Sequence, residues 1–348
     1  IHPSNPRAAL SRRTSAEEAS VGQLCGCILA YMDCAAAAAA IYRLPVECVA
    51  HAIAMTTPGD ALSSSAVSPA FRAAADSDAV WDRFLPRDHA DVLARADDAG
   101  DHRECSMSNK ELFTRLCSRP VLLDGATMSF GLDRRSGAKC WMLSARALSI
   151  VWGDDPSCWT WTADLPGSRF PEVAELVDVC WLEITGKLQL SLLTPRTTYA
   201  AYLVYAIADD SYGLECNIGI LPPKATVTVV VSGNSTKPTS TATSTSTENT
   251  ICLQHMQGEE ETAMHRRRQE YVRPRKNYGW KLVREADMDI RCPRRRGDDG
   301  WTEVELGEFA VAGEEDGVVE VSLKEVECRR WKRGLIVQGI EIRPKHTN

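Results

Sequence analysis

The sequence predicts an α+β protein with more than one domain. A small N-terminal bundle of three helices is followed by an antiparallel β-sandwich of jelly-roll type. Prolines and capping residues separate short apolar runs of helical spacing between residues 41 and 86. Short alternating runs, separated by Gly, Pro and Asp, recur between residues 121 and 346. Strands at both ends of one domain are expected of a Greek-key or jelly-roll sandwich.

Residues 1–40 precede the first domain, and we expect them to form a disordered leader. Two arginines stand before an apolar patch from Val21 to Met32, which superficially resembles a signal peptide. Acidic residues such as Glu18 and Asp33 interrupt this pattern. We therefore expect no secretory route, and we expect the protein in the cytoplasm, the nucleus or both.

The first predicted domain covers residues 41–86. Pro45 suits the first turn of a helix, and Val49 and Ile53 follow it at helical spacing. A bundle of about forty-five residues has little core of its own. It usually needs a partner or a neighbouring domain for stability.

Two capping motifs divide this domain into helices. Thr57-Pro58-Gly59-Asp60 stops the first helix and begins the second, because Thr57 or Asp60 can accept a free backbone N–H. Ser68-Pro69 begins a third helix by the same combination of a capping residue and a proline. After this helix, Val80 and Trp81 are expected to be buried in the core of the bundle.

Residues 87–120 are predicted to be a helical connector. Asp88 to Ala99 is a polar run with helical spacing. Lys110 to Cys117 places Phe113 and Leu116 on one helical stripe. We expect these helices to join the bundle to the following domain.

The β-domain is predicted to cover residues 121–346. Its clearest strand-like runs are Cys140–Leu143, Leu148–Trp152, Val179–Ile184, Trp301–Phe309, Val318–Val326 and Leu335–Ile342. An insertion at about residues 232–276 is predicted to be disordered or a loop. Ser232 to Thr250 is almost pure Ser and Thr, which cannot bury apolar area and should be disordered. The basic stretch that follows is either a solvated loop or a nuclear-localisation or RNA-binding patch, and we favour the loop.

Five tryptophans lie between residues 141 and 181. Such a cluster can form a sandwich core, or a surface on which sugar rings stack. Burial is the default, because an indole contributes a large hydrophobic gain.

Composition excludes several classes of function. The net charge of −7 argues against a general nucleic-acid binder. The thirteen cysteines are scattered without a CxxC pair or histidines at zinc-like spacing, which favours reduced thiols and predicts no metal. No apolar run reaches the ~20 residues of a membrane span, and nothing predicts a cofactor.

An enzyme is not expected, and no catalytic residue is assigned. The sequence has no GxSxG, HExxH or phosphate-binding loop. Asp154-Asp155 beside Trp152 would suit a glycosidase, but adjacent residues point in different directions and rarely face one bond together. We interpret Asp154-Asp155-Pro156 as a turn.

The β-domain resembles the phloem-lectin (phloem protein 2) domain of plants, a β-sandwich that binds GlcNAc oligomers. The resemblance rests on ordered motifs between about Val121 and Lys345. They are SF-LD--SG-KC-MLSARAL-I-WG-DP--W-W, RFPEVAEL--VCWLEI-GK, LTPRTTYAAYLVY, GWTEVELGEF and GLIVQGIEIRPK. Gly131 stands where the family usually has a tryptophan, which predicts that one aromatic wall is missing.

Residues 41–86 resemble an F-box, the module that docks a Skp-family adaptor in cullin-based ubiquitin ligases. Val46 stands where the family often has an acidic residue. An F-box directly before a phloem-lectin domain is a known plant arrangement. The resemblance implies an adaptor-binding set of Leu44, Pro45, Val49, Ile53, Ala61, Val67, Phe71, Val80 and Trp81.

Two functions follow from these resemblances. The first is the substrate-recognition subunit of an SCF-type E3 ubiquitin ligase, which binds an adaptor, through it a cullin, and a glycoprotein or protein target. The alternative is a free intracellular lectin for GlcNAc oligomers or N-glycans, with a non-functional F-box. Sugar binding requires aromatic faces with a few fixed polar groups. Our candidates are Trp152, Asp154, Trp159 and Trp161, for which a role in the core stays open.

Overall fold

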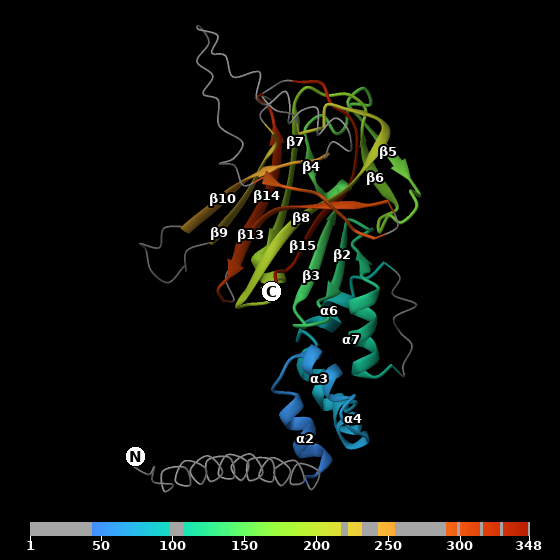
Figure 1. The fold of residues 1–348 in the computed structure, drawn as a ribbon, viewed down its shortest axis with the longest axis vertical. Coiled ribbons are helices and arrows are strands. Elements are labelled where there is room, and N and C mark those ends of the chain that lie inside the picture. Colours follow the sequence, from blue (N-terminus) through green and yellow to red (C-terminus); the bar gives the residue numbers. More distant parts are fainter. Residues whose placement is uncertain are drawn as a thin grey trace, which may run out of the picture. The chain divides into compact units, whose positions relative to one another are not determined.

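The computed structural model describes residues 44–97, 107–216, 222–231, 243–254, 290–297, 300–313, 316–327 and 330–346. The chain divides into two compact units, of which one ends at Phe84 and the other begins at Leu85 (Figure 1). The predicted leader, residues 1–40, lies outside the described residues, as does most of the predicted insertion.

The first unit contains four short helices within residues 44–84. They are α2 (Val46–Ile53), α3 (Pro58–Ser64), α4 (Pro69–Ala75) and α5 (Asp78–Phe84). The first three are the helices that the sequence predicts. Helix α5 is additional, and it forms because Val80, Trp81 and Phe84 lie on one helical face.

The predicted caps of α3 and α4 are confirmed. The Thr57 hydroxyl accepts the Asp60 N–H at 3.2 Å, and the Asp60 carboxylate accepts the Thr57 N–H at 3.3 Å. This reciprocal capping box satisfies two backbone donors that the helix itself cannot pair. The Ser68 hydroxyl accepts the Phe71 N–H at 3.3 Å, so α4 begins in the same way.

The second unit is built on two sheets, which are antiparallel apart from one pair among the described strands. The first sheet has the order β1-β2-β3-β15-β8-β13-β12, with β6 paired to β15 and β5 paired to β6 (Figure 1). Its strands are β1 (Val121–Leu123), β2 (Met128–Leu132), β3 (Lys139–Ser144), β5 (Trp159–Ala163), β6 (Glu172–Leu176), β8 (Thr197–Tyr212), β12 (Arg294–Arg295), β13 (Thr302–Val311) and β15 (Arg333–Pro344).

The second sheet has the order β11-β10-β9-β14-β7-β4. Its strands are β4 (Ser149–Ile150), β7 (Leu182–Gln189), β9 (Lys224–Val231), β10 (Thr243–Ile251), β11 (Ile290–Arg291) and β14 (Gly317–Glu325). The parallel pair is β10 with β11. Short 3-10 helices, η2 (Ala145–Ala147) and η3 (Leu190–Leu192), follow β3 and β7.

The two sheets contact each other through apolar side chains. On β13, Gly307 lies so close to β9 that a Cβ atom there would be 2.7 Å from the Val227 side chain. The Asn249 amide of β10 donates to the Leu306 carbonyl at 2.9 Å, also across the two sheets. Buried residues alternate along β7 and β9, as expected of strands with one face in a core.

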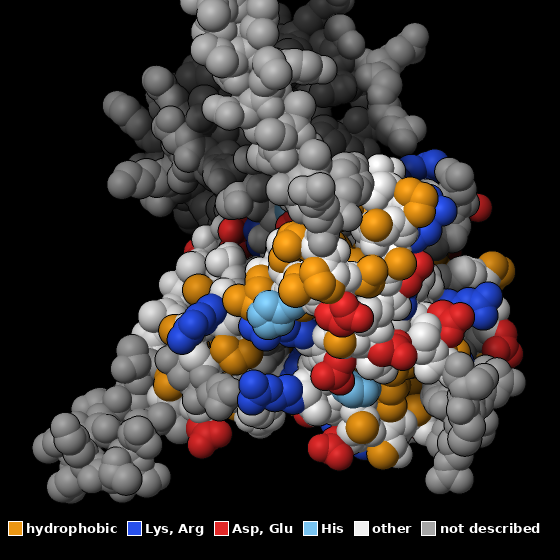
Figure 2. Space-filling view, turned by 90° about the horizontal axis from the view of Figure 1, so that it is seen from below, with side chains coloured by type: hydrophobic (Ala, Val, Ile, Leu, Met, Phe, Trp, Pro, Cys, Tyr) orange, Lys and Arg blue, Asp and Glu red, His pale blue; other side chains and the backbone are white. Residues whose placement is uncertain are grey.

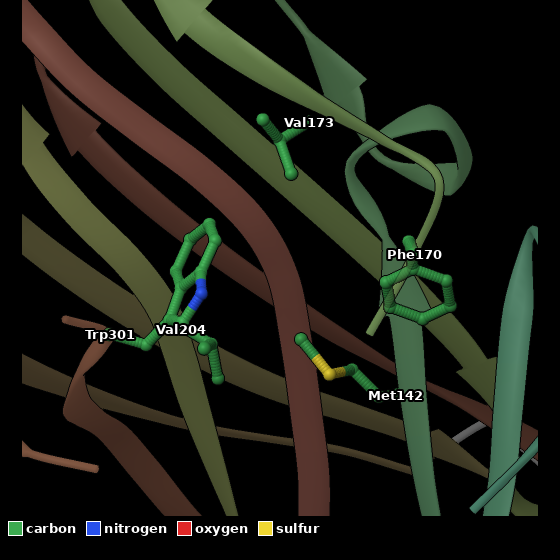
Figure 3. Close-up of a cluster of buried hydrophobic side chains, with 5 residues drawn as sticks. All are labelled: Met142, Phe170, Val173, Val204 and Trp301. Atoms are coloured by element: carbon green, nitrogen blue, oxygen red, sulfur yellow. The ribbon is translucent and has the colours of Figure 1, made fainter. Parts of the chain in front are cut away.

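A second apolar cluster lies on the other face of the first sheet. Met142 and Val204 alternate with Leu143 and Leu203, so they point away from the inner face. Figure 3 shows them with the other members of the cluster, Phe170, Val173 and Trp301. The Trp301 indole donates to the Pro166 carbonyl at 3.2 Å, which holds the β5–β6 connection over this face.

Two helices begin the second unit, α6 (His89–Leu93) and α7 (Asn109–Ser118). They fall within the predicted connector. The end of α7 lies against β2, where a Cβ atom at Gly131 would be 3.0 Å from the Leu116 carbonyl oxygen. The glycine at position 131 thus lets the end of α7 lie close to β2.

The predicted disorder of Ser232 to Thr250 is wrong for its second half, because Thr243–Ile251 forms β10. This strand pairs with β9 over its length, for example Thr245 with Val229. Threonine is β-branched and has a high strand propensity, so a neighbouring valine-rich strand can order it without much buried area. The remaining residues, 232–242, lie outside the described part of the chain.

Candidate functional site

The residues assigned to adaptor binding separate into a buried and an exposed group. The buried group forms the interior of the helical unit: Val49, Ile53, Ala61, Val80 and Trp81. The Trp81 indole donates to the Ala75 carbonyl at 2.6 Å and meets the Phe84 ring edge-on. In the unit by itself, these side chains hold the helices together.

The exposed group consists of Leu44, Pro45 and Val67, and Phe71 is half-buried. The Leu44 side chain is 51% exposed and that of Val67 is 61% exposed. Figure 2 shows hydrophobic side chains at the surface among acidic and basic ones. Large aliphatic side chains that are exposed in this way provide an apolar surface that a partner protein can cover.

Two further exposed apolar residues belong to the same stretch, Val46 and Met55. Met55, which follows α2, is 62% exposed and was not identified from the sequence. Helical periodicity could not have identified it, because it lies past the helix end. The large exposed apolar side chains of the helical unit thus come from the start of α2 and the turns after α2 and α3.

The second candidate site is the turn between β4 and β5. Trp152 has a φ of 58° and a side chain that is 46% exposed. The Asp155 carboxylate accepts the Ser157 N–H at 2.9 Å and its hydroxyl at 2.7 Å, which lowers the pKa of Asp155. The predicted turn role is confirmed for Asp155, and Asp154 beside it is exposed.

The other two tryptophans assigned to sugar binding have little free surface. Trp159 is 2% exposed and belongs to the core. Trp161 is half-buried, and the Arg146 guanidinium lies 3.6 Å from the centre of its ring. Arg146 also pairs with Glu172 at 2.9 Å, so it is held over that indole face. Of the four assigned residues, only Trp152 and Asp154 are exposed.

Other exposed aromatic residues occur in the β unit: Trp181, Tyr212 and Trp331. The Trp181 indole donates to Glu183 at 3.1 Å, and the Tyr212 hydroxyl donates to Asp178 at 2.8 Å. This bond raises the pKa of Tyr212. Sequence reasoning missed Tyr212 and Trp331 as surface residues, because strand alternation breaks down at both positions.

An ion-pair network covers part of the outer face of the first sheet. Arg343 pairs with Glu341 and Glu303, each at 2.6 Å, and lies 3.8 Å from the centre of the Tyr202 ring. Arginines 169, 296 and 343 lower the pKa of the buried Glu341 to about 2, although burial alone would raise it. A carboxylate held ionised in this way cannot serve as a general acid at neutral pH.

Within the described residues, no group of three or more His, Cys, Asp or Glu side chains is arranged to hold a metal ion. No helix in the described parts of the chain is long and apolar enough to span a membrane.

The chain thus has two parts, a small helical unit with large exposed apolar side chains and a larger unit of two β-sheets. A family model described as Phloem protein 2 matches residues 138–344, most of the second unit. Relatives in Arabidopsis thaliana match both units. The chain belongs to the plant F-box proteins that carry a phloem protein 2 domain.

Three of these Arabidopsis thaliana relatives indicate the extent of the similarity. F-box protein PP2-B15 is 37% identical over 309 residues, which cover 87% of this chain and 96% of the relative. F-box protein PP2-B1 is 36% identical over 326 residues, which cover 88% and 90%. F-box protein VBF is 36% identical over 305 residues, which cover 87% and 99%.

Proposed function

We propose that this protein is the substrate-recognition subunit of an SCF-type ubiquitin ligase. In this proposal the helical unit docks a Skp-family adaptor, and through it a cullin. The β unit, a jelly-roll-like sandwich in this view, binds a glycoprotein or protein target. The ubiquitin chemistry belongs to the enzyme that the complex recruits, in the cytoplasm or nucleus.

The observation that carries this proposal is the exposed apolar group of the helical unit. Leu44 and Val67 are more than half exposed, although the same unit buries Trp81 completely. A large aliphatic side chain gains about 1.5–3 kcal/mol when it leaves water. An adaptor that covers this group would therefore gain affinity without any change in the interior of the unit.

The mechanism that follows is proximity. A target held by one unit and an adaptor held by the other are joined by one chain. Tethering raises the effective concentration of target lysines near the recruited enzyme. The subunit needs no catalytic residue for this role.

The test is a quantitative binding measurement between the full chain and a purified plant Skp-family adaptor. Leu44→Ser combined with Val67→Ser should weaken binding at least tenfold, since each loses apolar contact in the interface. Val230→Ser is the matched control, because Val230 is an exposed valine of the β unit. A well-folded wild type without measurable adaptor affinity would refute the proposal.

A second candidate function is that of a free intracellular lectin, and exposed Trp152 beside exposed Asp154 favours it. A small-molecule site combines aromatic faces with a few fixed polar groups, and Trp152 with Asp154 offers one of each. In this case GlcNAc oligomers or N-glycans should bind the wild type, Trp152→Ala should lose them, and Trp331→Ala should keep them. Glycan binding without adaptor binding would favour the lectin over the ligase subunit.

A further inference from the structure

Three cysteine-bearing segments lie side by side at the end of β10. The Cys216 N–H donates to the Gln254 carbonyl at 3.3 Å, and the Cys252 N–H donates to the Arg291 carbonyl at 2.9 Å. Cys292 follows Arg291 directly. The fold thus brings together cysteines that are 36 or more positions apart in the sequence.

Cys216 and Cys252 are near enough to each other that each thiol shifts the pKa of the other. The Cys216 sulfur lies 4.0 Å from the carbonyl of Ile251, the residue before Cys252. The Cys252 S–H donates to the Gln254 carbonyl at 3.4 Å, and the same carbonyl accepts the Cys216 N–H. Both sulfur atoms therefore lie around the same short stretch of backbone.

The environment makes the two thiols unequal. The S–H of Cys216 and the N–H groups of Cys216 and Gln254 favour a thiolate at Cys252 and lower its pKa. The same contact, together with burial, raises the pKa of Cys216. A thiol with a lowered pKa next to a second thiol is the arrangement of a reactive cysteine with a resolving partner.

A buried tyrosine, Tyr205, is hydrogen-bonded to the backbone next to Cys252. The Tyr205 hydroxyl donates to the Leu253 carbonyl at 2.5 Å. Burial and the nearby Cys252 and Cys216 raise the pKa of Tyr205, so the hydroxyl stays protonated and keeps this bond. The backbone directly after Cys252 is thereby fixed to β8 of the first sheet.

We propose that Cys216 and Cys252 form a reversible intramolecular disulfide when the protein meets hydrogen peroxide. The Cys252 thiolate attacks one peroxide oxygen, the O–O bond breaks, and hydroxide leaves and takes up a proton as water. Cys252 is then a sulfenic acid. The Cys216 sulfur attacks that sulfur, the S–S bond forms, the S–O bond breaks, and the second water leaves with the Cys216 proton.

The disulfide would cross-link the two ends of the segment that contains β9 and β10. The chain between Cys216 and Cys252 contains β9 and β10. Closing this loop removes conformational freedom from the unfolded chain and should stabilise the second sheet against unfolding. The proposal stands independently of the ligase function.

Peptide mapping of the full chain tests the proposal directly. The reduced protein is treated with one equivalent of hydrogen peroxide, blocked with N-ethylmaleimide and digested with trypsin without reductant. Trypsin cleaves after Lys224, so Cys216 and Cys252 fall on separate peptides with one cysteine each, 197–224 and 225–266. We expect these peptides to be linked, and dithiothreitol should separate them.

Variants provide the controls. Cys216→Ser and Cys252→Ser should each abolish the link, whereas Cys180→Ser, a partly buried cysteine elsewhere in the β unit, should keep it. Oxidised wild type should unfold several degrees above reduced wild type, and Cys216→Ser should lose this shift. A link from Cys252 to the Cys292 peptide would overturn the proposal, as would oxidised Cys252 beside free Cys216. Since these outcomes are read on the wild type, a variant that fails to fold does not affect them.

Discussion

Lys332 and Glu325 form an ion pair in which both side chains are buried. The Lys332 ammonium also donates to the Arg330 carbonyl at 2.7 Å and to the Cys180 carbonyl at 3.2 Å. Its hydrogen bonds thus join the segment before β15, the segment before β7 and the end of β14. Charges removed from water are stable only when they are paired and hydrogen-bonded in this way.

Removal of one partner should therefore be severe. Lys332→Met leaves the Glu325 carboxylate buried without its counter-charge, and we expect a loss of about 3–5 kcal/mol in the free energy of unfolding. The combined variant Lys332→Met/Glu325→Leu should recover most of this loss. Urea denaturation followed by tryptophan fluorescence measures both. Lys187→Met is the control, because its pair with Glu320 is exposed, and an equal loss there would contradict the argument.

Acid stability should depend on Glu341. Its folded-state pKa is about 2, against an ordinary value of 4.5, because arginines 169, 296 and 343 favour the ionised form. Ionised Glu341 therefore stabilises the fold above about pH 4.5, and this contribution is lost as the pH falls toward 2. A shift of this size corresponds to about 3 kcal/mol.

The measurement is the apparent thermal midpoint of wild type and Glu341→Gln between pH 7 and pH 3. The variant should be less stable at pH 7, and the two midpoints should converge as the pH falls. Parallel curves would show that Glu341 does not contribute to the acid response.

The helical unit should depend on the capping box of α3. Thr57→Ala removes the acceptor for the Asp60 N–H and should cost about 1 kcal/mol of stability. Ser63→Ala on the same helix is the control, since that hydroxyl only donates to the Gly59 carbonyl within the helix. Circular dichroism at 222 nm during heating measures both. If the control loses as much as Thr57→Ala, the cap is not the cause.

Replacement of Gly131 should destabilise the contact between α7 and β2. A methyl group there would be 3.0 Å from the Leu116 carbonyl oxygen, so Gly131→Ala requires the end of α7 to shift by a few tenths of an ångström. We expect a loss of about 1–3 kcal/mol in a denaturation experiment. Gly313→Ala has open space around its Cβ position and should change stability little. A neutral Gly131→Ala would mean that α7 moves at no cost.

The helices that begin with a capping hydroxyl followed by a proline could be predicted from the sequence. Ser68-Pro69 and Thr57-Pro58 combine a hydroxyl acceptor with a proline that is already in helical geometry, and both helices begin there. Helix α5 is preceded by Ser77 but has no proline at its start, and it was missed. Strand β10 was missed for a different reason, because pairing with β9 orders a segment whose own composition indicates disorder.

The sites were harder to predict than the fold, because side-chain exposure depends on tertiary packing. Nothing in the local sequence distinguishes buried Trp159 from exposed Trp152, seven positions earlier in the same motif. The position of Arg146 over Trp161 likewise requires the sheet to bring η2 next to β5 and β6. The sequence could therefore indicate which residues belong to the two candidate sites. It could not separate the residues buried beneath each surface from those exposed to a ligand or partner.

Strand β15 has a consequence for the order of events during synthesis. It lies inside the first sheet, where β8 pairs with one edge and β3 and β6 pair with the other. During translation these three strands leave the ribosome before their common neighbour exists. Until Arg333–Pro344 is made, their backbone edges are open to pairing with another chain. We therefore expect the β unit to complete its first sheet late, and a nascent chain that stalls before Arg333 to expose these edges to aggregation.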